Sequence, residues 1–139
     1  MKVNIFYSWQ SDVRAAANRS FIQVALEAAV KEIRDDDSIT VSPVVDRDML
    51  GTPGSPDIGT TILRKIENSA VFIADVTIVG EYKDKRYTPN PNVMLEVGYA
   101  IKSLGESRLI LVQNVALGGP ELLPFDLRQK HILRYSFPT

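Results

Sequence analysis

The sequence contains no cysteine, and histidine occurs only once, at His131. The absence of cysteine excludes a disulfide framework and thiolate metal sites, and it is typical of proteins in a reducing compartment. His131 has no Cys or second His to join it, as a metal centre or a histidine-based catalytic triad would require. We therefore expect neither a metal site nor such a triad, and no resident cofactor.

Neither sign of charge is in excess, because 16 basic and 17 acidic residues give a formal net charge of -1. The chain therefore lacks the long-range field that gathers nucleic acids or anionic membranes. Long apolar runs are also missing: the start, "MKVNIFYSWQSD", is too short and polar for a signal peptide or a membrane span. We expect a cytoplasmic protein that binds neither nucleic acid nor membrane.

The 139 residues, 45% of them hydrophobic, suffice for a single domain, residues 1–139, with one core. β-branched and aromatic residues concentrate in five short runs, which predict strands. The runs are 3–9, 39–45, 70–76, 108–114 and 131–135. Pro43 in the second run indicates an edge strand, because proline cannot donate to a hydrogen-bond ladder.

Between these runs, apolar residues recur every three or four positions and predict amphipathic helices. The first helix covers 21–33, and the second follows the cap signal Ser55-Pro56. The third begins at Asn90-Pro91 and ends at Gly105. Its inward residues are Met94, Val97, Ile101 and Leu104. Segment 77–90 has no clear period, and 115–128 is expected to be a long loop with a helical turn. Alternating strands and helices form right-handed parallel units. We therefore predict an α/β fold of the flavodoxin-like three-layer αβα type, with a five-stranded parallel sheet of order 2-1-3-4-5.

In such open sheets the ligand crevice lies at the carboxyl ends of the strands, where the strand order reverses. The sequence places polar and aromatic residues at these ends, and we expect them to converge on one rim and bind a substrate. They are Tyr7, Ser8, Trp9 and Asp12 after the first strand, Asp46 and Arg47 after the second, Asp75 after the third, and Asn92 at the start of the third helix.

Glu96 is a lone carboxylate within the apolar helical stretch 90–100. It follows Asn92 by four residues, so both side chains share a helix face that we expect to look toward the crevice or its margin. Apolar surroundings raise the pKa of a carboxylate unless a donor compensates. Such a group acts as a nucleophile, a general base or a stabiliser of a developing cation, and the last role suits glycosidic bonds. The alternative is an ordinary solvated helix residue.

Two further features have two interpretations each. Trp9 either stacks on a purine or nicotinamide ring or packs at its strand end. The glycine-rich segment 51–55 precedes a helix N-terminus, as phosphate-binding loops do, but it lacks the lysine of the nucleotide-triphosphate motif. A loop that covers the crevice is the alternative for this segment.

Segments 5–12, 54–77, 90–100 and 123–128, in this order, resemble the bacterial TIR-like domains of antiphage defence proteins. The resemblance implies the TIR fold, which has the architecture predicted above. It also implies cleavage of NAD+ between nicotinamide and ribose by Glu96, with ADP-ribose or a cyclic isomer as product. The sequence departs from the family pattern at Asn92, where the better-known NAD-cleaving TIR domains carry Trp.

The same resemblance assigns roles around the substrate. Nicotinamide is expected near Tyr7, Ser8 and Trp9, under the loop that begins at Asp46. Arg47 would hold the pyrophosphate by its planar fork, and Asp75 either orients a ribose hydroxyl or caps the turn after its strand. Activation is expected to need assembly into a homo-oligomer, triggered by a sensor protein or a second messenger.

Two other interpretations stay open. Residues 91–100 are also similar to nucleoside 2-deoxyribosyltransferases, flavodoxin-like enzymes with a nucleophilic glutamate, which again assigns Glu96 to the anomeric carbon of a sugar. Many TIR domains are instead non-catalytic adaptors that self-associate. Such an adaptor needs exposed apolar surface, for which 77–82 and 115–123 are the candidates.

Overall fold

The computed structural model describes residues 1–46 and 58–138. Within these residues, five strands form one parallel sheet in the order β2-β1-β3-β6-β7. The strands are β1 (Lys2–Ser8), β2 (Ser42–Asp46), β3 (Val71–Asp75), β6 (Leu109–Asn114) and β7 (Ile132–Tyr135). Counted among the strands of this sheet, the order is the predicted 2-1-3-4-5, which confirms the flavodoxin-like α/β fold. β2 lies at an edge, as Pro43 indicated.

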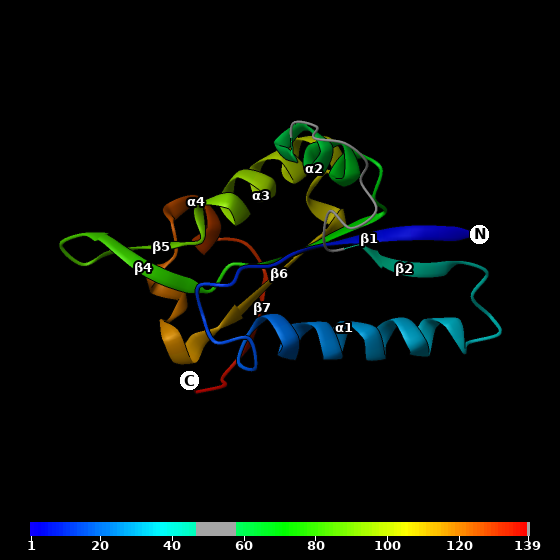
Figure 1. Cartoon of the computed structure of the whole chain (residues 1–139), viewed down its shortest axis with the longest axis horizontal. Helices are drawn as coiled ribbons and strands as arrows, with labels where there is room; N and C mark the ends of the chain where they lie inside the picture. Colours follow the sequence, from blue (N-terminus) through cyan, green and yellow to red (C-terminus); the bar gives the residue numbers. More distant parts are fainter. Residues whose placement is uncertain (47–57, 139) are drawn as a thin grey trace.

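Helices cover both faces of the sheet and produce three layers (Figure 1). One face is covered by α1 (Arg19–Arg34), and the other by α2 (Ile58–Glu67) and α3 (Pro91–Leu104), which contact each other. The segments around β6 form short turns, including the helical turns expected in 115–128. These are η1 (Glu106–Arg108), η2 (Val115–Leu117), η3 (Pro120–Leu122) and α4 (Phe125–Arg128). None of the described helices is long and apolar enough to cross a membrane.

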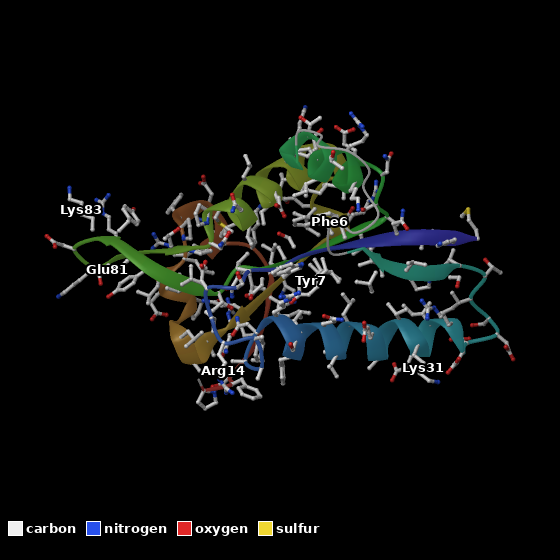
Figure 2. All side chains as sticks on the ribbon, in the orientation of Figure 1. Phe6, Tyr7, Arg14, Lys31, Glu81 and Lys83 are labelled. Atoms are coloured by element: carbon white, nitrogen blue, oxygen red, sulfur yellow. The ribbon has the colours of Figure 1, made fainter. Side chains whose placement is uncertain are left out.

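The core is divided by the sheet into two clusters. Phe6 stacks on Phe72, with ring centroids 5.8 Å apart, in the larger cluster under α2 and α3. Tyr7 belongs to the smaller cluster with Ile22 and Val30 of α1. Successive side chains of a strand point to opposite faces, so Phe6 and Tyr7 lie on opposite sides of β1 (Figure 2). This alternation decides which residues at the end of β1 meet α3.

The ends of α3 follow the signals in its sequence. The side-chain oxygen of Asn90 accepts from the backbone N–H groups of Asn92 and Val93 at 2.8 and 3.0 Å. At the other end, Gly105 has a φ of 82°, which costs glycine less than other residues. The inward face differs slightly from the prediction, since Met94 and Ile101 are only partly buried. The fully buried positions of α3 are Val93, Val97, Ala100 and Leu104.

An antiparallel hairpin follows β3 in the segment for which the sequence indicated no element. β4 (Ile78–Lys83) pairs with β5 (Arg86–Pro89), and the hairpin projects beyond the main sheet (Figure 1). Ile78 is buried, but residues 81–83 are all exposed, so β4 shows no alternation of apolar and polar positions. The period that identifies a half-buried strand is therefore missing from this segment.

Candidate functional site

A hydrogen bond joins the carboxyl end of β1 to the second turn of α3. The Ser8 hydroxyl donates to Oε1 of Glu96 at 2.7 Å, across 88 residues of sequence. Ser8 lies two positions after Phe6 and therefore points to the α3 face of the sheet. Its side chain is buried, whereas Glu96 is half-buried. Ser8 and Glu96, which the sequence assigned to the site separately, are thus in direct contact at the rim where parallel sheets bind ligands.

Burial raises the pKa of the Glu96 carboxyl above its ordinary value, and the hydrogen bond from Ser8 opposes part of that rise. Loss of hydration is the larger of the two effects, because one hydroxyl does not replace the water that a carboxylate attracts. The carboxyl group is therefore held in a partly dry setting. A carboxylate in this state is suited to stabilise a cation or to attack an electrophilic carbon.

The loop after β1 is fastened to the helix that carries Glu96. The amide nitrogen of Asn90, the residue that caps α3, donates to Asp12 at 2.7 Å. Gln10 fixes the loop from within, because its side-chain oxygen accepts from the backbone N–H groups of Asp12 and Val13 at 2.7 and 3.2 Å. Asp12 itself is exposed to solvent, so a ligand can reach its side chain.

Asp75 lies at the end of β3 and is fully buried. One carboxylate oxygen accepts from the side-chain amides of Gln10 and Asn18 at 2.9 and 3.0 Å. The other accepts from the backbone N–H of Thr77 at 3.1 Å. Of the two interpretations of Asp75, this geometry supports the cap of the turn after its strand rather than a contact with a ribose hydroxyl.

The Asp75 cluster continues into a network that ties four segments together. The Asn18 amide donates to the Thr77 hydroxyl at 2.9 Å, and the same hydroxyl accepts from the backbone N–H of Asn114. The Asn114 side chain in turn donates to Asn18 Oδ1 at 3.0 Å and exchanges hydrogen bonds with the backbone of Phe137. The ends of β1, β3 and β6 are thereby held in register beneath the site.

Two aromatic residues predicted to line the site lie on the other face of the sheet. Tyr7 is fully buried, and its hydroxyl donates to the backbone oxygen of Arg19 in α1 at 3.0 Å. Trp9 packs partly buried against the same cluster, with the Arg19 guanidinium 3.8 Å from its ring centroid. Because alternate residues of β1 face opposite ways, Ser8 reaches Glu96 while Tyr7 and Trp9 turn toward α1.

The remaining predicted site residues are placed as follows. Asn92 is exposed on α3, and its backbone N–H is used in the cap. Asp46 ends β2 with its backbone opposite Phe6, while its side chain lies outside the described residues. Arg47, the glycine-rich segment 51–55 and the Ser55-Pro56 cap signal lie outside them as well. His131 is exposed and directly precedes β7, rather than lying within it as expected.

Sequence reasoning did not assign any role to Asn18 or Asn114, although both are buried at the rim. An asparagine at the start of a helix or the end of a strand is common, so neither carries a distinctive signal. Across residues 1–46 and 58–138, no cluster of His, Asp or Glu side chains has an arrangement that could hold a metal ion.

Comparison with protein families finds no match, and comparison with curated proteins finds none either. Among solved structures, the chain is similar to a 2-desoxiribosyltransferase from Leishmania mexicana, with a TM-score of 0.46 and 18% sequence identity. The similarity covers 81% of this chain and 65% of that protein.

Proposed function

We propose that the protein cleaves the N-glycosidic bond between nicotinamide and ribose in NAD+, and that Glu96 acts on the anomeric carbon. The observation that carries the proposal is the half-buried Glu96 carboxylate, held by Ser8 at the carboxyl end of β1. The resemblance of segments 5–12, 54–77, 90–100 and 123–128 to bacterial TIR-like domains, many of which cleave NAD+, supports the choice of substrate.

The chemistry needs little beyond a well-placed anion. As the bond to nicotinamide breaks, its electron pair stays with the ring nitrogen, so the cationic ring leaves as a neutral base and needs no proton donor. Positive charge develops on the ribosyl carbon, and the Glu96 carboxylate stabilises it or bonds to it briefly. Water then adds to this carbon and releases a proton, which gives ADP-ribose. Attack by an atom of the same nucleotide gives a cyclic isomer instead.

The direct test is nicotinamide release from NAD+ by the purified protein, with Glu96→Gln as the matched control because it keeps the size and one oxygen for Ser8. The measurement is repeated over a wide range of protein concentration, because we also propose that assembly into a homo-oligomer completes the site. Release by wild type alone supports the proposal. Equal release by both proteins, or none at any concentration, contradicts it.

Deoxyribosyl transfer is the second candidate, favoured by the similarity of residues 91–100 to nucleoside 2-deoxyribosyltransferases. The Glu96 carboxylate would then displace the first base, which leaves with the bonding electron pair and takes up a proton, and form a glycosyl ester. A second base attacks the same carbon, loses a proton and releases the carboxylate. Incubation of the protein with a deoxynucleoside and a different free base separates the candidates. Base exchange without nicotinamide release from NAD+ would assign the transferase activity.

A self-associating adaptor finds less support in the two segments named for it. Ile78 and Leu123 are buried, at 5% and 2% exposure, and Val79, Leu117 and Leu122 are only partly exposed. Tyr82 is exposed at 65%, but it lies on the hairpin among charged neighbours. A single exposed aromatic residue is common on protein surfaces and does not by itself indicate a binding site.

A further inference from the structure

A shallow cavity of about 490 Å³, largely open to solvent, lies between the loop after β1 and the hairpin. It is bordered by loop residues 12–14, by 78–81 of β4, by Tyr87 of β5 and by Leu117 of η2. Figure 2 labels Arg14 on the loop side and Glu81 on the hairpin side. Neither the sequence patterns nor the Ser8–Glu96 pair accounts for this cavity.

The cavity is adjacent to the helix that carries Glu96. Asp12 belongs to its lining and also accepts the hydrogen bond from Asn90, the cap of α3. Glu96 follows Asn90 by six residues, which is about 9 Å along a helix axis. A ligand longer than one nucleoside can therefore span both places.

The lining offers three kinds of contact. Val79, Tyr87 and Leu117 form apolar surface that a purine base can cover. Asp12 and Glu81 each use one carboxylate oxygen, toward Asn90 and the backbone N–H of Lys85. The second oxygen of each can accept from a ribose hydroxyl.

Arg14 supplies the cation of this cavity. It is exposed, and its planar guanidinium matches the oxygens of a phosphate group. A phosphate between the two carboxylates would be repelled without it. An apolar surface, two hydroxyl acceptors and one phosphate donor together match a nucleoside monophosphate.

We propose that this cavity binds the adenosine monophosphate half of a dinucleotide whose other half reacts at Glu96. This inference rests on the proposed function and makes the enzyme selective for a dinucleotide over a single nucleoside. The hairpin is then a substrate-recognition element, and Gly80, Arg14 and Tyr87 determine specificity rather than catalysis.

Gly80 offers a clean way to block the cavity. A Cβ atom at this position meets nothing within 4 Å, and the backbone is not in the left-handed region, so Gly80→Leu introduces a larger side chain at the lining without backbone strain. Arg14→Glu reverses the phosphate contact. Its matched control is Arg86→Glu, the same charge change at an exposed hairpin residue outside this lining.

The experiment compares NAD+ with nicotinamide riboside, which has the same scissile bond but no second nucleotide. We expect Gly80→Leu and Arg14→Glu each to raise KM for NAD+ roughly tenfold or more. Gly80→Leu blocks the space for the second nucleotide, and Arg14→Glu replaces an attractive contact with its phosphate by a repulsive one. Cleavage of nicotinamide riboside should change less than about twofold, and Arg86→Glu should resemble wild type. Equal effects on both compounds, or none, would overturn the subsite.

Binding of adenosine monophosphate, measured by titration calorimetry, tests the subsite without catalysis. We expect wild type to bind it and Gly80→Leu to bind it roughly tenfold more weakly. Binding that is absent from wild type, or unchanged by Gly80→Leu, overturns the subsite even if NAD+ is cleaved. If neither NAD+ nor nicotinamide riboside is cleaved while this binding is sensitive to Gly80→Leu, the proposed function fails and the cavity remains a nucleotide site.

Discussion

Two carboxylates lie at the same rim of the sheet, and their surroundings differ in kind. Asp75 is fully buried and accepts three hydrogen bonds, from Gln10, Asn18 and the backbone of Thr77. Glu96 is half-buried and accepts one described hydrogen bond, from Ser8. The first carboxylate has three donors in place of its hydration, whereas the second has one described donor and keeps capacity for a ligand.

The difference separates a structural acid from a candidate catalytic one. A buried carboxylate is stable only when donors replace its hydration, and those donors leave no room for a substrate atom. Burial removes water from a carboxylate, and its pKa rises when too few hydrogen-bond donors replace that water. Glu96 is such a group, because burial raises its pKa. The comparison predicts that substitution of Glu96 lowers activity without destabilising the fold, while substitution of Asp75 destabilises the fold.

The largest effect is expected for Glu96→Gln. We expect nicotinamide release from NAD+ to fall about a thousandfold, equivalent to about 4 kcal/mol of transition-state stabilisation, because the charge that faces the developing cation is lost. Steady-state kinetics measure the fall, and urea unfolding should show no loss of stability. Activity within tenfold of wild type would remove Glu96 from the reaction.

The next effect is a loss of stability in Asp75→Ala. Three donors in the buried network lose their acceptor, and we expect the free energy of unfolding to fall by about 3 kcal/mol. Urea denaturation measures the change. Asp75→Asn serves as the volume-matched comparison, and it should also destabilise, because its NH2 group faces other donors. A loss below about 1 kcal/mol in Asp75→Ala would show that the network is not needed for folding.

A smaller effect is expected for Ser8→Ala, which removes the one donor to Glu96 found among residues 1–46 and 58–138. That donor favours the ionised carboxylate, so its loss raises the pKa of Glu96 further. The acid limb of the pH–rate profile should move to higher pH, with activity near the limb reduced by about tenfold, or about 1.4 kcal/mol. A profile that keeps its position would separate Ser8 from the ionisation of Glu96.

The smallest effect concerns the free energy of unfolding, because the difference between Glu96→Gln and wild type should depend on pH. A folded-state pKa above the unfolded value means that the fold favours the protonated acid. This contribution is complete below the ordinary pKa of glutamate and is lost as pH rises through the folded-state pKa. The stability of Glu96→Gln relative to wild type should therefore grow over that pH range. Urea unfolding at several pH values measures it, and an opposite slope would contradict the burial of Glu96.

Much of the architecture could be predicted because its signals are local. The apolar run in β3 indicated a buried parallel strand, and Asn90-Pro91 and Gly105 marked both ends of α3. The hairpin could not be predicted, because its burial follows no alternating pattern and its tip is exposed to solvent. Polar residues in such a pair show no period.

The candidate site was only partly within reach of sequence reasoning. The helical pattern singled out Glu96, and the rule for open sheets selected the end of β1. Three neighbours there, Tyr7, Ser8 and Trp9, were all expected at the rim. The face of the sheet to which each side chain points depends on how β1 lies between β2 and β3. Of these three residues, only Ser8 points to the face that carries α3 and contacts Glu96.

The sequence by itself determined the alternation of strands and helices and the ends of α3, because periodicity and capping act between residues close in the chain. Only the tertiary structure decided which carboxylate has donors in place of its hydration and which keeps capacity for a ligand. Hydration and hydrogen bonding of an acid depend on residues brought together from distant segments, such as Ser8 with Glu96 and Asp75 with Gln10 and Asn18.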